Sequence, residues 1–350
     1  MKAALMQMGR LWVDDIDTPD PQSGEVLVKS LACGICGSDL HALKHTEAFI
    51  KTSREVGGAF KLTEDQPVVL GHEFCAEVVA FGENTDAQLR PGQRVCSVPA
   101  LTRPDGVHAV GYSAAAPGGF GEYMVLSERL LLPVPDGLPT ELAALTEPTA
   151  VGYHAVKKAR LNADDVPLVI GCGPVGLAVI LALKLDGIGP VIAADYSPAR
   201  RALAERVGAD VVVDPADTSP FDQWAVHATV MHAERKRLRN AVFFECVGVP
   251  GVIESLMVGA PREARIVVVG VCLETDHFRP LVAVNKELEM QFVLGYTRAE
   301  FEQTLHAIAD GRLDVSPLIT GEVSLDGTAQ AFERLTNPEG DAKILVKPWG

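Results

Sequence analysis

Cysteine, histidine and acidic residues gather in three short segments of the first half of the chain. The first segment, Gly34–His41, reads Gly-Ile-Cys-Gly-Ser-Asp-Leu-His, and Gly71-His72-Glu73 and Thr146-Glu147-Pro148 follow it. A thiolate, an imidazole and a carboxylate suit a zinc ion, and a catalytic zinc has about three protein ligands and one open position. The three segments together indicate such a site, and no one of them does so alone.

A glycine-rich motif in the middle of the chain predicts a dinucleotide site. Gly171-Cys-Gly173-Pro-Val-Gly176 follows an apolar run and opens a helical pattern, and Asp195 ends the next apolar run. The first glycine allows a tight turn, the second admits the pyrophosphate, and the third lets helix and strand pack closely. A glycine-rich turn without a ligand is the weaker alternative. The predicted cofactor-binding residues are Gly171, Gly173, Pro174, Val175, Gly176, Asp195, Arg200, Val247, Gly248, Gly270 and Val271.

The acid after the second strand favours NAD over NADP. Asp195 can accept hydrogen bonds from a ribose and would repel a 2′-phosphate. Arg200 and Arg201 follow at the start of a helical pattern, where a basic side chain could stack on adenine or simply be solvated. Glu245–Gly248 and Val269–Val271 lie at the ends of later strands, where doubly wound sheets hold their ligands, although ordinary turns would look the same.

Two kinds of patterning predict two domains of an α/β protein. The first 150 residues hold short β-rich runs such as 25–29 and 77–80, which indicates a mostly antiparallel β domain. From about Val166, apolar strands alternate with helices, as a doubly wound parallel sheet requires. Its expected strands are 167–170, 191–194, 241–244, 265–269 and 289–294, with a helix at 174–186.

The last part of the chain is expected to fold back onto the first domain. It contains helical patterns at 299–311 and 328–335 and strand patterns at 317–320 and 343–347. We therefore predict one domain from residues 1–152 with 296–350 and a second from 153–295. Polar residues 214–223 are expected to form a loop within the second domain.

Charge and composition exclude several classes of partner. The 350 residues carry 46 acidic and 31 basic side chains, a net charge of −15 that repels phosphate backbones and anionic lipids. Nucleic acid and membrane partners are therefore not expected. The N-terminus shows no targeting pattern, and the longest apolar stretch, Val175–Leu183, is too short for a bilayer, so we expect a cytoplasmic protein. The seven scattered cysteines are expected to be reduced.

These motifs, in this order, resemble the zinc-dependent medium-chain dehydrogenases, particularly the sorbitol, butanediol and threonine dehydrogenase branch. The resemblance covers essentially the whole chain and rests on Gly-Ile-Cys-Gly-Ser-Asp, Gly-His-Glu, Glu-Pro-x-x-Val-Gly and the Rossmann fingerprint. It implies a GroES-like catalytic domain beside a Rossmann domain. It also implies hydride transfer between NAD and a secondary alcohol, polyol or ketone as small-molecule substrate.

The resemblance also assigns the metal ligands. Cys36, His72 and Glu73 correspond to the zinc ligands, and Glu147 would ligate directly or through water. Which of the two carboxylates is bound at rest stays open. Zinc lowers the pKa of a bound hydroxyl from about 16 toward about 7, which makes an alkoxide available near neutral pH.

Three residues near the first ligand acquire roles by the same resemblance. Ser38 would hydrogen-bond the alcohol oxygen, and His41 would pass its proton toward solvent through the cofactor ribose. With Glu73, these are the predicted catalytic residues. Asp39 would hold the ring of His72 and so select its ligating tautomer.

The chain departs from the family pattern in two places. Many members bind a second, structural zinc through four closely spaced cysteines, whereas this chain has only Cys96 there. We predict no structural zinc in the lobe at 97–119 and expect Val107, Val110 and Tyr112 to pack it instead. The segment Lys44–Gln66 is longer than usual and would border the substrate pocket or a subunit contact.

Alternative interpretations remain at several positions. Cys33 and Cys36 could form a dithiol redox motif, although Cys33 is better explained as a buried small residue, like Cys75, Cys172 and Cys272. Arg298 could face a polyol, with a surface role slightly favoured. A zinc-free quinone or enoyl reductase and a non-catalytic nucleotide-binding protein are the competing functions. A homodimer or homotetramer is expected through the edge strand at 289–294.

Overall fold

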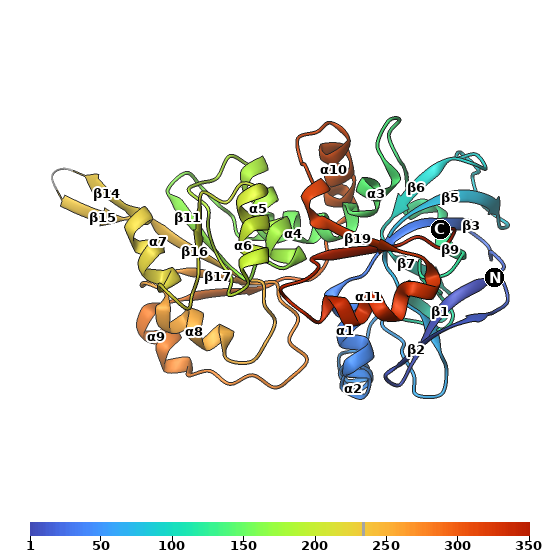
Figure 1. Ribbon diagram of the computed structural model, residues 1–350, viewed down its shortest axis with the longest axis horizontal. Coiled ribbons are helices and arrows are strands. Elements are labelled where there is room, and N and C mark those ends of the chain that lie inside the picture. The colour runs from blue at the N-terminus through green and yellow to red at the C-terminus, as the bar shows by residue number, and fades with distance from the viewer. Residues whose placement is uncertain (233–234) are drawn as a thin grey trace.

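Two sheet-based regions lie side by side along the long axis of the molecule (Figure 1). The structure is a computed structural model that describes residues 1–232 and 235–350. The chain leaves the first region through helix α4 (Thr146–Lys158) and returns to it after strand β18 (Glu289–Phe292). The expected boundary at residue 152 falls inside α4.

The first region is built on a seven-stranded sheet in the order β10-β6-β5-β3-β20-β19, with β9 also paired to β3. Its strands are β3 (Glu25–Gly34), β5 (Glu73–Phe81), β6 (Arg94–Ser97), β9 (Tyr123–Ser127), β10 (Leu131–Pro133), β19 (Ile319–Val323) and β20 (Lys343–Val346). The C-terminal strand β20 lies antiparallel to β3. This is the predicted GroES-like, mostly antiparallel domain.

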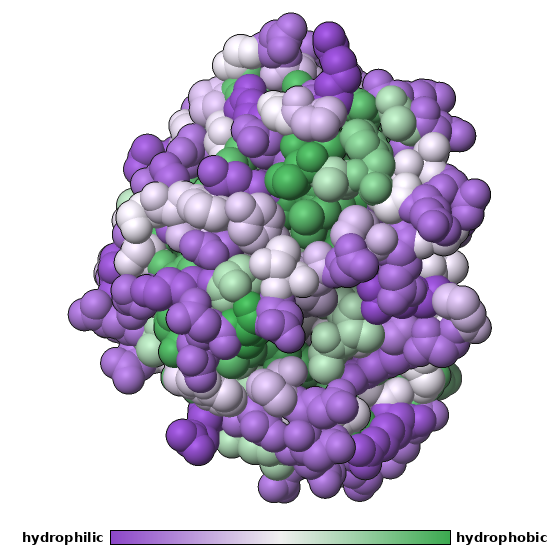
Figure 2. All heavy atoms as spheres, turned by 90° about the vertical axis from the view of Figure 1, so that its right-hand side faces the viewer, coloured by the Kyte–Doolittle hydropathy of each residue, from purple (hydrophilic) through white to green (hydrophobic). Residues whose placement is uncertain are grey.

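Smaller elements complete this region. They are β1 (Lys2–Gln7), β2 (Arg10–Asp15), β4 (Val68–Val69), the hairpin of β7 (Ala100–Arg103) and β8 (Gly106–Ala109), α1 (Gly37–Lys44), α2 (Thr46–Val56), α3 (Thr140–Ala144), α10 (Arg298–Ala309) and α11 (Thr328–Leu335). Figure 2 views the molecule from this end, where hydrophobic patches interrupt a mainly hydrophilic surface.

The second region is a six-stranded parallel sheet in the order β13-β12-β11-β16-β17-β18. Its other strands are β11 (Asp165–Ile170), β12 (Ile192–Ala194), β13 (Val211–Val213), β16 (Asn240–Glu245) and β17 (Arg265–Val268), and its helices are α5 (Pro174–Leu185), α6 (Pro198–Arg206), α7 (Pro220–Ala228), α8 (Val252–Gly259) and α9 (Pro280–Lys286). A hairpin of β14 (Thr229–His232) and β15 (Arg235–Leu238) projects from its far end (Figure 1).

Burial on both faces explains why these strands are apolar throughout. Leu168 and Val169 are consecutive on β11, and each is fully buried in a different hydrophobic cluster. Successive side chains of a strand point to opposite faces, so a sheet covered by helices on both sides needs apolar residues at every position. The predicted doubly wound sheet is confirmed.

Two local predictions were wrong. The expected loop at 214–223 ends early, because Pro220 starts helix α7 and the side chain of Ser219 caps it by accepting from the backbone of Asp222. The expected strand at 317–320 begins only at Ile319, after a 3-10 turn at Ser316–Leu318. No helix in the described part of the chain is both long and apolar enough to cross a membrane.

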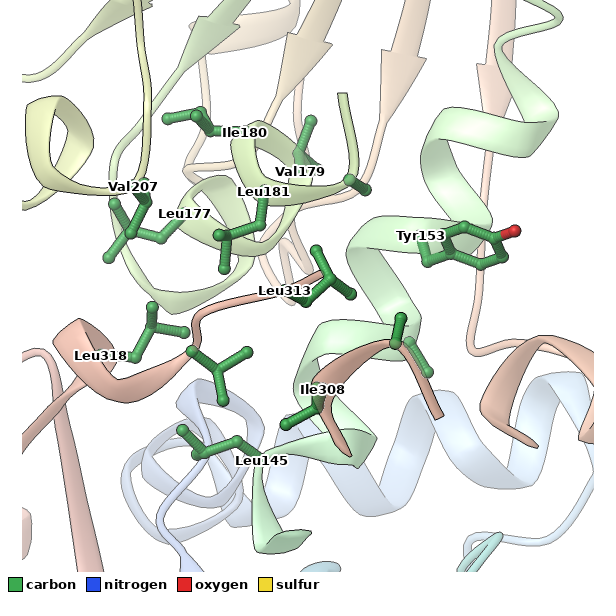
Figure 3. Close-up of a cluster of buried hydrophobic side chains, with 14 of the residues drawn as sticks. Leu145, Tyr153, Leu177, Val179, Ile180, Leu181, Val207, Ile308, Leu313 and Leu318 are labelled. Carbon is green, nitrogen blue, oxygen red and sulfur yellow. The ribbon is translucent and has the colours of Figure 1, made fainter. Parts of the chain in front are cut away.

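A shared hydrophobic core joins the two regions around α4 (Figure 3). Leu145, just before α4, and Tyr153 within it belong to this core with Leu177 and Leu181 of α5 and Leu313 of the returning chain. Because α4 packs against the Rossmann helix α5, the residues at its N-terminal end are held where the two regions meet.

Candidate metal and cofactor site

Strand pairing brings the three predicted zinc ligands together. Cys36 follows β3 as the N-cap residue of α1, whereas Glu73 is the first residue of β5 and His72 directly precedes it. The register of β3 and β5 places Glu73 opposite Gly34, two residues before Cys36. The ligand atoms of Cys36, His72 and Glu73 all lie within 4.8 Å of one another. This thiolate, imidazole and carboxylate set fits a zinc ion.

A buried lysine holds Glu73 from the side of the C-terminal strand. Lys343 Nζ lies 2.7 and 2.6 Å from the two carboxylate oxygens of Glu73 and donates to the carbonyl of Ile35 at 2.9 Å. Burial lowers the pKa of Lys343, but the charges of Glu73 and Cys36 outweigh it, so the net pKa is raised. Sequence reasoning missed Lys343; its only signal was a charged residue opening the apolar run Lys-Ile-Leu-Val.

The close approach of Glu73 to the opposite strand requires a glycine there. A Cβ atom added to Gly34 would lie 2.2 Å from Glu73 Oε2. Gly34 therefore leaves room for the carboxylate at the end of β3.

Glu147 lies at the N-terminal end of α4 and is also buried, but it is outside the cluster of three ligand atoms that the described residues form. The hydroxyl of Tyr296 donates to Glu147 Oε1 at 2.7 Å. Burial raises the pKa of Glu147 to about 7, with the charge of His72 acting against the rise. Sequence reasoning missed Tyr296 and considered its neighbour Arg298 instead. Arg298 is exposed and lies 3.3 Å from Glu302, one turn further along α10.

Helix α1 carries the three remaining predicted residues of this site. Asp39 is fully buried; its Oδ2 accepts from the backbone of Cys36 at 3.0 Å, and its Oδ1 lies 3.4 Å from His72 Nδ1. Burial lowers the pKa of His72, but the charge of Asp39 outweighs it and raises the pKa well above its usual value. Ser38 and His41 are half-buried and lie one turn apart, on the same side of α1. The pKa of His41 is lowered, first by burial and then by the nearby charge of His45.

The glycine motif has the geometry that its sequence predicts. Gly171 has φ +93° and a Cβ there would lie 2.7 Å from Val247, whereas a Cβ on Gly176 would lie 1.8 Å from the carbonyl oxygen of Gly171. Gly173 caps α5 and Pro174 follows at its first position. The turn is thus tight and the helix packs directly on the strand, as the binding of a pyrophosphate at the N-terminus of α5 requires.

The two arginines after β12 differ in role. Arg201 donates to the carbonyls of Asp195 and Tyr196 and pairs with Asp214 at 2.8 Å, so it supports the loop and is not merely solvated. Arg200 approaches the glycine turn: its Nη1 lies 4.0 Å from where a Cβ of Gly173 would be. Among the described residues its buried Nε finds no hydrogen-bond partner.

The loops after β16 and β17 meet beside the glycine motif. Glu245 Oε1 accepts from the backbones of Val247 and Gly248 at 2.7 and 2.9 Å, and a Cβ on Gly270 would lie 2.4 Å from the nitrogen of Gly248. Val271 remains 47% exposed. Strand β11 pairs with both β12 and β16, so these loops border the point where strand order reverses, which is where such sheets bind ligands.

The described cysteines do not form disulfides. Cys33 is fully buried on β3, and burial raises the pKa of its thiol well above the usual value. A raised thiol pKa opposes the dithiol redox alternative, because the thiolate is the reactive form. Cys75 and Cys172 are buried as expected, whereas Cys272 is only half-buried because it lies in the loop after β17.

Two known domain families match this chain. The alcohol dehydrogenase GroES-like domain matches residues 22–136, and the zinc-binding dehydrogenase domain matches residues 174–310. The (R,R)-butanediol dehydrogenase of Bacillus subtilis is 34% identical over 96% of both chains. The chain belongs to the zinc-containing medium-chain alcohol dehydrogenases.

Other members of this alcohol dehydrogenase family are similar over nearly the full length. The sorbitol dehydrogenase of Bacillus subtilis is 29% identical over 99% of this chain and 97% of the relative. The crystal structure of 2R,3R-butanediol dehydrogenase from Bacillus subtilis superposes with a TM-score of 0.81, at 31% identity and 99% coverage of both chains. The family assignment agrees with the ligand cluster Cys36, His72 and Glu73, and makes this protein an oxidoreductase that acts on CH–OH groups with NAD or NADP.

Proposed function

We propose that this protein interconverts a secondary alcohol, diol or polyol and the corresponding ketone with NAD as the hydride carrier. The observation that carries the proposal is the meeting of Cys36, His72 and Glu73 within 4.8 Å, with Ser38 two residues after the first ligand. Two similar proteins are named for butanediol and sorbitol, both of which carry secondary hydroxyl groups.

Each residue of the site would have its own role in the reaction. A bound zinc ion supplies Lewis-acid stabilisation of the negative charge that develops on the alcohol oxygen, and a bound nicotinamide accepts the hydride. Cys36, His72 and Glu73 would hold the ion. Glu147 on α4 would be available to bind it directly or through water. Ser38 would accept a hydrogen bond from the substrate hydroxyl. His41 lies one helical turn from Ser38, and its lowered pKa keeps it neutral near pH 7. It would therefore be able to accept the proton that the alcohol releases.

The preference for NAD rests on Asp195. Its Oδ2 accepts from the backbone of Cys172 at 2.7 Å and its Oδ1 from that of Ser197 at 2.8 Å. The carboxylate is therefore held at the glycine turn, where it would repel a 2′-phosphate. Arg200 would pack against the adenosine side of the cofactor.

We also propose that one zinc ion per chain is sufficient, because a polar network ties together the lobe at 97–119. His108 Nε2 lies 2.9 Å from Asp105 Oδ1 and 3.1 Å from Lys61 Nζ, and His108 Nδ1 lies 2.9 Å from Ser113 Oγ. Val110 and Tyr112 are buried as expected, but Val107 is 44% exposed because it lies on the β7–β8 hairpin. Hydrogen bonds and apolar packing would thus replace the metal.

Metal analysis and a substrate screen test these proposals together. We expect one zinc per chain and NAD-linked oxidation of diols, sugar alcohols or cyclic alcohols, lost after chelation and restored by zinc. Cys36→Ser should lose both zinc and activity, whereas Cys33→Ala, a change on the neighbouring buried strand, should keep the zinc. Full activity without metal would favour a zinc-free reductase instead, and NAD binding without turnover of any alcohol would favour a non-catalytic protein.

A further inference from the structure

Tyr112 belongs to the lobe at 97–119, yet its hydroxyl reaches the active site. The phenolic oxygen lies 2.8 Å from Ser38 Oγ and 2.9 Å from Asp39 Oδ1, and the residue is 3% exposed. Its ring lies 5.3 Å from the ring of His72, measured between centroids. Tyr112 therefore contacts the residue expected to bind the alcohol and the carboxylate beside a metal ligand.

The chemistry of these three groups decides which one donates. A carboxylate can only accept, and a phenol has a single hydrogen. Tyr112 therefore donates to Asp39 and its oxygen accepts the hydrogen of Ser38. In this arrangement the hydroxyl hydrogen of Ser38 points toward Tyr112, and the lone pairs of its oxygen remain available to a substrate hydroxyl.

The segment Lys44–Gln66 holds Tyr112 in place. The ring of Phe49 stacks on Tyr112 at 5.6 Å with an interplanar angle of 9°, and Phe60 meets it edge-on at 5.2 Å. The backbone of Lys61 also donates to the carbonyl of Tyr112 at 2.9 Å. The segment and the lobe at 97–119 thus meet at one tyrosine.

We propose that Tyr112 is a positioning residue that orients Ser38 for the alcohol, and that segment Lys44–Gln66 acts on the reaction by holding Tyr112. The proposal rests on the proposed dehydrogenase function. Without the phenolic hydroxyl, Ser38 loses the acceptor of its hydrogen and can rotate among its staggered rotamers. Only part of the population then presents its oxygen to the substrate.

The test is Tyr112→Phe, which removes one hydroxyl and keeps the packing of the ring. We expect kcat to fall roughly tenfold, the equivalent of about one hydrogen bond, with KM and zinc content nearly unchanged. Tyr123→Phe is the matched control: Tyr123 lies on β9, its ring packs against Trp349, and its change should leave kcat unaltered. Phe60→Leu should lower kcat in the same direction, since it removes the edge-on support of Tyr112.

A double-mutant cycle distinguishes the positioning of Ser38 by Tyr112 from a general loss of structure in the variant. In a Ser38→Ala background, Tyr112→Phe should have little further effect on kcat, because the hydrogen-bond partner is already gone. A crystal structure of metal-free Tyr112→Phe should show Ser38 in more than one rotamer. An undiminished effect in the Ser38→Ala background, or an unchanged kcat in Tyr112→Phe, would overturn the proposal. Failure of the dehydrogenase function itself would appear separately, as an inactive wild-type protein.

Discussion

Lys343 and Glu73 form an ion pair with no access to solvent: Nζ lies within 2.7 Å of both carboxylate oxygens, and both residues are fully buried. The two residues are 270 positions apart in the chain. They meet because β20, which carries Lys343, and β5, which carries Glu73, both pair with β3. The pair holds the carboxylate of a predicted zinc ligand in place. It also gives Glu73 a charge partner when no metal is bound.

Removing the lysine should destabilise the protein strongly. Lys343→Met leaves a buried, unpaired carboxylate, and breaking such a pair costs about 3–5 kcal/mol. Urea unfolding of the metal-free protein measures this loss. Lys2→Met is the control, because Lys2 pairs with Asp326 at the exposed surface, where ion pairs contribute at most about 1 kcal/mol. Equal losses of unfolding free energy in the two variants would show that the buried pair contributes no more than a surface pair. Combining Lys343→Met with Glu73→Gln should recover part of the stability, because the unpaired charge is then removed.

The raised pKa of Glu147 should make the metal-free protein less stable as the pH rises. Burial moves this pKa from its usual 4.5 to about 7, so between these values the folded chain holds a proton that the unfolded chain has lost. Stability therefore falls from about pH 4.5 to about pH 7, by about 3 kcal/mol for a shift of this size, and this contribution is constant above pH 7.

Glu147→Gln should remove this dependence, because an amide does not titrate and can still accept the hydrogen bond from Tyr296. Chemical unfolding from pH 4.5 to 8 checks the difference between the two proteins. Glu83→Gln, at an exposed position, should leave the pH profile of the wild type intact. Parallel profiles for wild type and Glu147→Gln would mean that Glu147 is already ionised in the folded protein.

Asp195 should control the choice between NAD and NADP. Asp195→Ser removes a carboxylate that would repel a 2′-phosphate and leaves Arg200 nearby. We expect the ratio of kcat/KM for NAD to that for NADP to fall by about tenfold or more, the equivalent of one charged hydrogen bond. Steady-state kinetics with both cofactors measure it, with Asp217→Ser in an exposed loop as control. An unaltered ratio would leave Asp195 with only its role in holding the turn.

The edge strand of the parallel sheet should join two copies of the chain. Strand β18 ends the strand order, and its backbone edge can pair with a second β18. Phe292 is 59% exposed and Leu294 78%, so an apolar surface accompanies this edge. Leu294→Lys should shift a dimer toward monomer in size-exclusion chromatography with light scattering. Val226→Lys, at a position 65% exposed on α7, should not; a monomeric wild type would contradict the proposal.

Much of the fold could be predicted from local patterns. Strands buried on both faces must be apolar throughout, and Gly171-Cys-Gly173-Pro-Val-Gly176 needs a turn that only glycine can make, so the parallel sheet and its cofactor motif were visible in the sequence. The ligand types at Cys36, His72 and Glu73 were visible as well. Helix α7 was missed because the polar residues before Pro220 resemble a loop until Ser219 caps the helix.

Only the tertiary structure decided which distant side chains support these ligands. Lys343, Tyr296 and Tyr112 reach Glu73, Glu147 and Ser38 through strand pairing and loop packing that join segments far apart in the chain. No local pattern encodes such contacts, because a single lysine or tyrosine has the same appearance in the sequence whether it faces solvent or a buried carboxylate. The sequence by itself determined the residue types of the metal and cofactor sites, whereas their buried partners became identifiable only once the two regions had folded together.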